Sequence, residues 1–231
     1  MLISSDKSIR HSFRQKRKNH YTRGDTMVIT ISRQFGSRGR EIGKALAEHL
    51  SIAFYDKELI TLASQKSGIS EKHFEKYDEK ANSLLYTLSL GASAAVSTDY
   101  GTVPDVPIHD KLYLLQHDII RQIAEEPCVI VGRCADHVLS DRNDCAKIFI
   151  CADIDIRAAH VAERLHISKA KAYALIKKKD KSRANYYNYY ASGKWGDPNN
   201  YDMCINSSTL SVDGCMRLIT SYLLQKGIMV W

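Results

Sequence analysis

Short apolar segments alternate with helix-like segments along most of this chain, and that alternation limits the fold more than any other feature. The segments expected to be strands are VITIS (28–32), IAFYD (52–56), CVIVGR (128–133), AKIFICAD (146–153) and YDMCIN (201–206), and all of them except IAFYD are expected to be buried. Apolar residues at helical spacing lie between them, as in 39–50 and 109–126. Strands apolar on both faces that alternate with helices form parallel sheets covered on both sides. The sequence therefore predicts an α/β three-layer sandwich with a five-stranded parallel sheet.

The positive charge of the chain is concentrated near its start. The net charge of the chain is +7. Residues 1–26 contain seven Lys/Arg against two Asp, so residues 27–231 carry a net charge of only +2. Residues 1–26 lack apolar periodicity, so we predict a disordered basic arm. Either the arm binds nucleic acid or acidic partners through charge, or it lies upstream of the true translation start. The second interpretation is favoured, because the first strand begins directly at Met27.

Composition also predicts a cellular setting. No apolar run approaches the roughly 20 residues of a membrane span, and no apolar signal core is present. The six cysteines form no CxxC pair and have no zinc-like spacing with histidine. We therefore expect a soluble cytoplasmic protein whose thiols are buried and free. Cys134 is singled out because it lies inside a motif described below.

The loop GSRGREIGK (36–44) connects the first strand to the next helix. A helix N-terminus in this position favours an anion, and the usual phosphate loop reads GxxxxGK[ST]. Counting from Gly36 places Glu41 at the second glycine, and counting back from Lys44 places Arg38 at the first. The consensus fails in both registers, so Lys44 is expected to be an ordinary surface residue.

Three arginines, Arg33, Arg38 and Arg40, crowd the N-terminus of this helix. Positive side chains are unfavourable there unless an anion is bound. We predict that the backbone holds phosphate and that Arg40, or otherwise Arg38, supplies the missing charge. Glu41 is expected to be a helix N-terminal carboxylate rather than a metal ligand. The plain alternative is a tight turn that opens a helix.

The segment VITISRQFGSRGREIGKALAEHLSIAFYDKELI resembles the opening of cytidylate kinases, specifically the divergent cytidylate kinase-like group. Further segments match that family in order, namely VIVGRCAD (129–136), KIFICADIDIRA (147–158), KKDKSRANYY (178–187) and NNYDMCINSSTLSVDGC (199–215). Together they extend across residues 27–220. Laying Gly36–Ser37 on the family's GSGK[ST] loop places Arg38 at the glycine, Gly39 at the lysine and Arg40 at the Ser/Thr.

The resemblance implies a nucleoside monophosphate kinase-like P-loop domain over 27–231. It implies an acceptor-binding insertion near 66–108, where 71–96 looks helical, and a lid near 170–198. The implied reaction moves the γ-phosphoryl group of ATP, with Mg²⁺, to CMP, dCMP or another small acceptor. A nucleotide-binding regulatory protein with little transfer is the alternative, and a nucleic-acid binder that uses the arm is a third hypothesis.

The resemblance also implies roles for individual residues. The ATP- and phosphate-binding set is Gly36, Ser37, Arg38, Gly39, Arg40 and Arg157. The acceptor-binding set is Asp56, His117, Arg133 and Asp136. The catalytic set is Arg40, Asp180 and Arg183, with Arg183 as the transition-state stabiliser. Replacing Arg40 or Arg183 by alanine is expected to abolish most transfer. Metal ligands and oligomeric state are not predicted.

Departures from the family pattern lie mainly on the acceptor side. Cys134 stands where the family has an aspartate, Leu62 stands near an expected arginine, and His117 replaces another. Histidine is mostly neutral near pH 7, so it replaces an arginine only in part. CMP as the acceptor is therefore less firmly predicted than the fold. The tyrosines of YYNYY (186–190) are expected to pack a lid helix onto the core rather than to stack on bases.

Overall fold

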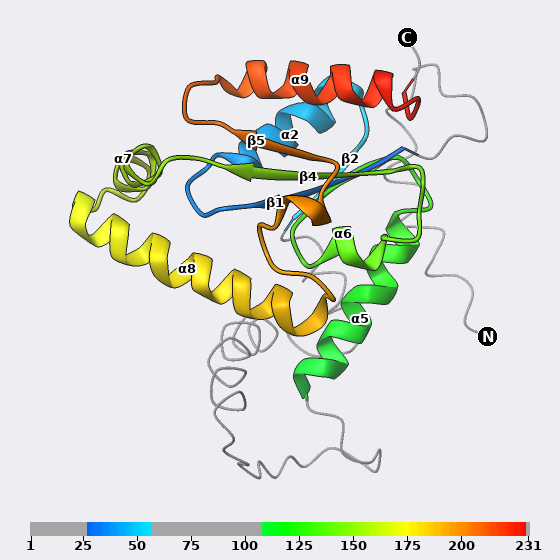
Figure 1. Ribbon diagram of the computed structural model, residues 1–231, viewed down its shortest axis with the longest axis horizontal. Helices are drawn as coiled ribbons and strands as arrows, with labels where there is room; N and C mark the ends of the chain where they lie inside the picture. The colour runs from blue at the N-terminus through cyan, green and yellow to red at the C-terminus, as the bar shows by residue number, and fades with distance from the viewer. Residues whose placement is uncertain (1–26, 57–107, 230–231) are drawn as a thin grey trace, which may run out of the picture.

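The computed structural model describes residues 27–56 and 108–229 (Figure 1). The predicted basic arm, the helix predicted at 71–96 and the acceptor-binding insertion up to residue 107 lie outside the described residues. The domain limits near 66–108 and 170–198 therefore stay predictions.

A five-stranded parallel sheet forms the centre of the protein, as the alternation of strands and helices predicts. Its strands are β1 (Val28–Arg33), β2 (Ala53–Tyr55), β3 (Cys128–Val131), β4 (Cys145–Cys151) and β5 (Met203–Asn206). They lie in the order β2-β3-β1-β4-β5, and every neighbouring pair is parallel. The carboxyl ends of all five strands therefore meet at one edge, where ligands bind in open α/β sheets.

Helices cover both faces of the sheet (Figure 1). The described helices are α2 (Gly39–Leu50), α5 (Ile108–Ile123), α6 (Ala135–Val138), α7 (Ile154–Leu165), α8 (Lys169–Tyr190) and α9 (Val212–Gln225), with the 3₁₀ helix η2 (Pro198–Asn200). Helices α2 and α9 cover one face, while α5 and α6 cover the other. Helices α7 and α8 pack against each other, and their apolar cluster reaches Phe35 in the loop after β1.

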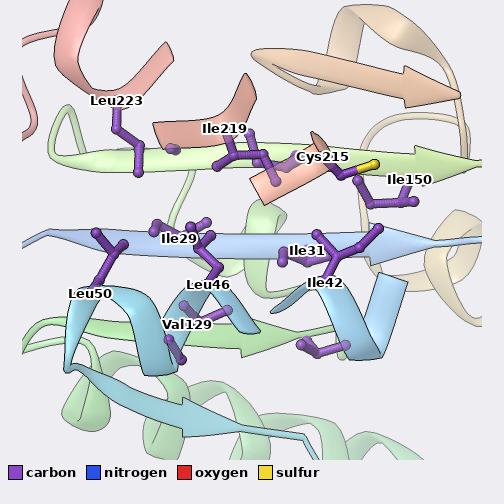
Figure 2. Close-up of a cluster of buried hydrophobic side chains, with 14 of the residues drawn as sticks. Ile29, Ile31, Ile42, Leu46, Leu50, Val129, Ile150, Cys215, Ile219 and Leu223 are labelled. Carbon is purple, nitrogen blue, oxygen red and sulfur yellow. The ribbon is translucent and has the colours of Figure 1, made fainter. Parts of the chain in front are cut away.

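The central strand sends alternate side chains into two apolar clusters. Ile29 and Ile31 pack with Ile42 of α2 and Ile219 of α9, as Figure 2 shows. Val28 faces the other way, into the cluster with α5 and α6. All five residues are 0–1% exposed, and complete burial of such a side chain contributes about 1.5–3 kcal/mol. This double-sided core fixes the end of β1, from which the phosphate loop begins.

Two sequence predictions fail at the edge strand β5. Ile205 is buried, but Cys204 is exposed, so β5 is not a strand buried on both faces. All six cysteines are free, but Cys204 on β5 is not buried as expected; Cys151, at the end of β4, is half-buried. An edge strand has one neighbour and less cover than a central strand, which explains the difference. Cys134 is buried, and burial raises its pKa well above the usual range, so its thiol is inert.

The tyrosines of α8 pack this helix onto α5, which confirms the packing interpretation. Tyr190 stacks on Tyr113 with ring centroids 4.0 Å apart, and Tyr186 lies edge-on to Tyr190 at 4.9 Å. Tyr187 is 5% exposed. Helix α8 therefore lies docked along its length, with Ala172, Ile176 and Tyr187 buried. In the two described ranges, we find no helix with the length and apolar character to cross a membrane.

Candidate phosphate-binding site

The loop between β1 and α2 has the backbone shape of an anion cradle. Gly36 has a φ of 85°, and Arg38 adopts a left-handed φ of 62° at the N-cap of α2. The left-handed conformation favours glycine, and Arg38 is the residue that aligns with a glycine of the family loop. Helix α2 begins at Gly39, and the first N–H groups of any helix have no intrahelical acceptor. They and the helix dipole favour an anion.

Gly36 also satisfies a tight contact. A Cβ at this position would lie 2.9 Å from Val161 Cγ2 and 3.0 Å from the carbonyl oxygen of Arg157. Both the positive φ and the contact with α7 therefore require glycine. The loop is thus held against α7 at the place where the sequence predicts phosphate.

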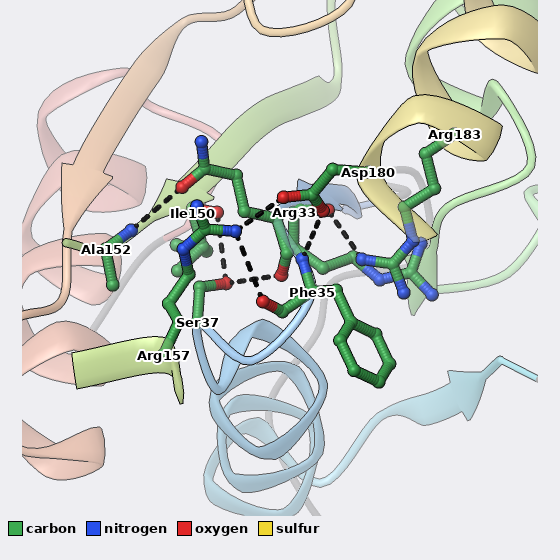
Figure 3. Close-up of polar contacts among 9 residues, drawn as sticks. Arg33, Phe35, Ser37, Ile150, Ala152, Arg157, Asp180 and Arg183 are labelled. Atoms are coloured by element: carbon green, nitrogen blue, oxygen red, sulfur yellow. Dashed lines mark hydrogen bonds and ion pairs between the residues drawn. The ribbon is translucent and has the colours of Figure 1, made fainter. Parts of the chain in front are cut away.

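The side chain of Ser37 shapes the loop instead of pointing toward a ligand. Its hydroxyl is 2.9 Å from the carbonyl oxygen of Gln34 and 3.1 Å from that of Ile150, and the residue is 1% exposed (Figure 3). The Gln34 side-chain oxygen accepts a hydrogen bond from Ala152 N at 3.1 Å. These bonds tie the loop to the end of β4. The Ser37 N–H also donates to the carbonyl oxygen of Gln34, at 3.4 Å, so both donors of Ser37 hold the loop in shape.

Arg157 and Asp180 join α7 and α8 to the same loop (Figure 3). Phe35 N donates to Asp180 Oδ1 at 2.7 Å, and Arg157 Nη1 donates to Asp180 Oδ2 at 2.5 Å and to Phe35 O at 3.3 Å. Arg157 is 7% exposed, and its Nε is a buried nitrogen without a hydrogen-bond partner among the described residues. The structure brings both predicted residues to the loop, but their charges neutralise each other.

Four arginines from separate segments gather beside the loop. Arg33 ends β1, Arg40 lies in the first turn of α2, Arg133 follows β3 and Arg183 lies on α8. Arg183 Nη1 donates to the carbonyl oxygen of Arg33 at 2.8 Å. Arg33 interacts electrostatically with each of the other three. Arg40, Arg133 and Arg183, each given a site role from the sequence, therefore all lie close to Arg33.

Asp56 is the carboxylate within this arginine cluster. Its Oδ2 lies 2.6 Å from Arg40 Nε, and its Oδ1 lies 3.4 Å from Arg33 Nη2. The Asp56 side chain is 11% exposed, whereas that of Arg40 is 53% exposed. Arg40 also lies over the Phe54 ring, 5.8 Å from its centroid. Arg40 therefore reaches toward β2, so Asp56, predicted to bind an acceptor, holds two arginines in place.

Arg33 is the site residue that sequence reasoning left out of the proposed site. Burial, followed by the neighbouring charge of Arg183, lowers its pKa to about 9, so it stays protonated at neutral pH. Burial also lowers the pKa of Arg183. Two cations in a confined space are stabilised by an anion. The available signals were its position at the end of a central strand and its place among the three arginines at the start of the helix.

The segment after β3 has an unusual backbone. Gly132, Arg133 and Cys134 have φ values of 82°, 59° and 54°, so three consecutive residues are left-handed. Residues other than glycine rarely adopt this conformation, and each instance costs on the order of 1–3 kcal/mol. Strain of this kind clusters at ligand sites. It places Arg133 beside Arg33, as the electrostatic coupling of the two shows.

Two residues predicted to bind an acceptor lie elsewhere. Asp136 is 3% exposed, and it accepts hydrogen bonds from Tyr187 Oη at 2.7 Å and Ser32 Oγ at 3.2 Å. Burial raises its pKa. His117 lies on α5, with its ring 6.3 Å from that of Tyr113 and its Nδ1 3.3 Å from Asp118 Oδ1. Asp136 is thus buried against Tyr187 and Ser32. His117 takes part in the aromatic contacts of α5.

The remaining charges of α2 are surface contacts. Lys44 is exposed and pairs with Glu48 at 3.7 Å, which confirms it as a surface residue. Glu41 lies in the first turn and accepts from Arg38 Nε at 2.9 Å, as expected for a helix N-terminal carboxylate. Arg38 therefore does not fill the place of the missing lysine in this conformation.

The described part of the chain contains no group of three or more His, Cys, Asp or Glu side chains that could hold a metal ion. Arg40 stands where the family has the hydroxyl that reaches magnesium, and the Ser37 hydroxyl is occupied within the loop. These residues do not fit a Mg²⁺ ion held by the protein. They do fit a polyphosphate, because the start of α2 presents backbone N–H groups and the arginines provide positive charge.

Comparisons with known proteins agree with this fold. The family model described as "Cytidylate kinase-like family" matches residues 28–209. A protein of Pyrococcus horikoshii named cytidylate kinase is 26% identical over 198 residues, which cover 84% of this chain and 87% of the relative. A cytidylate kinase of Sulfurisphaera tokodaii is 25% identical, and the match covers 85% of this chain and 95% of that protein. A solved structure of an uncharacterised protein from Eubacterium ventriosum is 32% identical, with a TM-score of 0.63, and covers 85% of this chain and 98% of its own.

Proposed function

Because this chain belongs to the cytidylate kinase-like family, we propose that it transfers the γ-phosphoryl group of ATP to a nucleoside monophosphate. Kinase activity on a nucleotide or nucleoside phosphate follows in general terms from the family and its relatives. CMP and dCMP are the first acceptors to test, because the curated relatives are named cytidylate kinases. ATP would enter as its Mg²⁺ complex, so the metal comes with the substrate.

The observation that carries the proposal is the gathering of guanidinium groups beside the start of α2. Within the described residues, four arginines lie near Asp56 and Asp180, and Asp180 also pairs with Arg157. Phosphoryl transfer depends mainly on positioning and on stabilisation of charge at the phosphoryl oxygens. Guanidinium groups suit both tasks, because they offer two parallel donors to phosphate oxygens.

Each element around the loop has a role in the proposed reaction. The start of α2 and the loop would bind the donor phosphates, and Arg133 would bind the acceptor phosphate on the neighbouring strand end. Arg183 would stabilise the transferred group, since α8 brings it to the end of β1. Arg157 and Asp180 would hold the loop in shape rather than contact the nucleotide. The docked α8 would also help to exclude water.

One observation favours a second candidate function, nucleotide binding without efficient transfer. Arg40 replaces the Ser/Thr of the family loop, so no hydroxyl stands where the family positions magnesium. A protein of this kind would bind MgATP and form little ADP. Binding and turnover measured on the same preparation separate the two candidates.

The test is ADP release from MgATP across a panel of nucleoside monophosphates and small hydroxyl compounds. We expect acceptor-dependent ADP formation, with a loss of about 100-fold or more in Arg183→Ala, and a large loss in Arg40→Ala. Lys178→Ala is the matched control, because Lys178 is an exposed cation on the same helix. Binding of MgATP with no ADP formed for any acceptor would favour the regulatory candidate. Normal turnover by both arginine variants would refute the assigned roles.

A further inference from the structure

Position 39, where the family loop has its lysine, has no room for a side chain. A Cβ on Gly39 would lie 2.6 Å from Arg33 Cβ, 3.1 Å from Arg33 Cγ and 3.3 Å from Ile150 Cβ. The Cβ atoms of Arg33 and Ile150 are attached directly to neighbouring strands, so neither can rotate away. The first part of the Arg33 side chain therefore fills the space above the start of α2, and glycine at position 39 is a requirement.

A second glycine makes room for the other end of the same side chain. A Cβ on Gly132 would collide with Arg33 Nη1 and would lie 3.0 Å from Arg33 Cζ. The Arg33 side chain thus runs from the start of α2, over Gly39, to the segment that carries Arg133. Two glycines from distant parts of the chain, one on each side of the site, accommodate one arginine.

In the described part of the chain, the guanidinium of Arg33 has more positive than negative neighbours. It pairs with Asp56 at 3.4 Å, a longer distance than the 2.6 Å between Asp56 and Arg40. Arg183, Arg133 and Arg40 each act on it repulsively. The Arg33 side chain is 18% exposed, so little solvent is available to screen it. A phosphate group would provide the missing counter-charge.

We propose that Arg33 is the phosphate-binding cation of this loop, and that it replaces a lysine at position 39 by reaching over that position from the end of β1. The inference rests on the proposed function, since it names the residue that binds the polyphosphate. It differs from the expectation drawn from sequence, in which Arg40 or Arg38 supplies this charge. Arg40 pairs with Asp56 at 2.6 Å and Arg38 with Glu41 at 2.9 Å. Arg33 pairs with Asp56 more loosely, at 3.4 Å, and its stem lies against Gly39 itself.

The first experiment measures binding of inorganic tripolyphosphate and of MgATP by titration calorimetry. Arg33→Met keeps an unbranched stem between the two glycines and removes the charge. We expect its affinity for both ligands to fall by about 10- to 100-fold. Lys44→Met is the matched control, because the same substitution at an exposed position of α2 should leave affinity within about twofold. Thermal unfolding checks that each variant is folded.

The second experiment moves the charge back to the helix. Gly39→Lys alone should weaken tripolyphosphate binding, because its Cβ collides with Arg33. The double variant Arg33→Gly/Gly39→Lys removes the collision and restores a lysine at the family position. We expect it to bind tripolyphosphate within about tenfold of the wild-type protein and more tightly than either single variant. This result also decides the question if Arg33→Met fails to fold.

The outcomes separate this inference from the proposed function. Wild-type affinity in folded Arg33→Met would overturn the inference, as would equal binding by Gly39→Lys and the double variant. If the wild-type protein binds tripolyphosphate through Arg33 but forms no ADP with any acceptor, the proposed function fails and the inference stands. If ADP forms at the wild-type rate in Arg33→Met, the function stands and the inference fails. A wild-type protein that binds neither ligand refutes both.

Discussion

Asp56→Asn is the change that best tests the charge balance of the arginine cluster. The substitution keeps the shape of the side chain and removes the negative charge that pairs with Arg33 and Arg40. The expected result is a protein that is less stable without ligand but binds polyphosphate more tightly. Most substitutions in a binding site weaken both properties, so the opposite signs are diagnostic.

The size of the effect follows from burial. Breaking a buried ion pair by removing one partner costs about 3–5 kcal/mol, and breaking an exposed pair costs about 0–1 kcal/mol. The Asp56 and Arg33 side chains are 11% and 18% exposed, while Arg40 is 53% exposed. We therefore expect a loss of about 2 kcal/mol in the free energy of unfolding. A tenfold gain in affinity, about 1.4 kcal/mol, is expected because an anion then replaces the lost carboxylate.

Urea unfolding with and without saturating tripolyphosphate measures both quantities. The ligand should recover much of the lost stability, since binding to the native state adds to the free energy of unfolding. Asp213→Asn is the control, because it removes one charge from an exposed pair with Arg217 on α9. Equal destabilisation with and without tripolyphosphate would refute the reasoning. Unchanged polyphosphate binding together with weaker CMP binding would instead favour the acceptor role predicted from sequence.

Three further predictions concern residues around the site. Tyr187→Phe removes a donor to the buried carboxylate of Asp136, and we expect a loss of about 1.5–3 kcal/mol at neutral pH. Burial raises the pKa of Asp136, so its charged form is the unfavourable one. The loss of stability in Tyr187→Phe should therefore shrink as the pH falls and Asp136 is protonated. Urea unfolding that shows the same loss at every pH would contradict this. Gly132→Ala should destabilise the protein by about 1–3 kcal/mol through its positive φ and its contact with Arg33. In a double-mutant cycle, combining it with Arg33→Ala should recover part of this loss of stability. Strictly additive losses in the double variant would contradict the prediction. Lys44→Ala should change stability by less than about 0.5 kcal/mol and leave ADP formation unchanged, and a tenfold loss of activity would show that Lys44 takes part in the reaction.

The sheet could be predicted because each strand is short, apolar and followed by a helical segment. Ile29, Ile31 and Val28 are apolar on both sides of β1, and this pattern needs cover on both faces. The exception, β5, fails because an edge strand can be apolar in sequence and still expose Cys204. Position in the sheet depends on the pairing of the strands, which local pattern does not reveal.

The site was predicted less completely than the fold. Arg33 was counted among the arginines at the start of α2, but the aligned loop motif begins at Gly36, so Arg33 was given no role in the site. It is the residue that fills the space over Gly39. That relation depends on the contact between β1 and the start of α2, and no spacing rule contains it. Asp136 was chosen for its nearness to Arg133 in sequence, but the fold turns it inward to Tyr187. Sequence neighbours after a strand can thus face opposite sides of the structure.

Helix α8 connects the loop after β1 to the contacts of α5 and α6. Asp180 of α8 holds the loop through Phe35 N, while Tyr187 and Tyr190 of the same helix engage Asp136 and the rings of α5. Asp180 and Tyr187 are two helical turns apart, about 10 Å along the axis. A shift at one end of α8 is transmitted along the helix to its other end. We therefore expect the phosphate donor and the phosphate acceptor to bind cooperatively. Thermodynamic reciprocity then requires that each ligand change the dissociation constant of the other by the same factor.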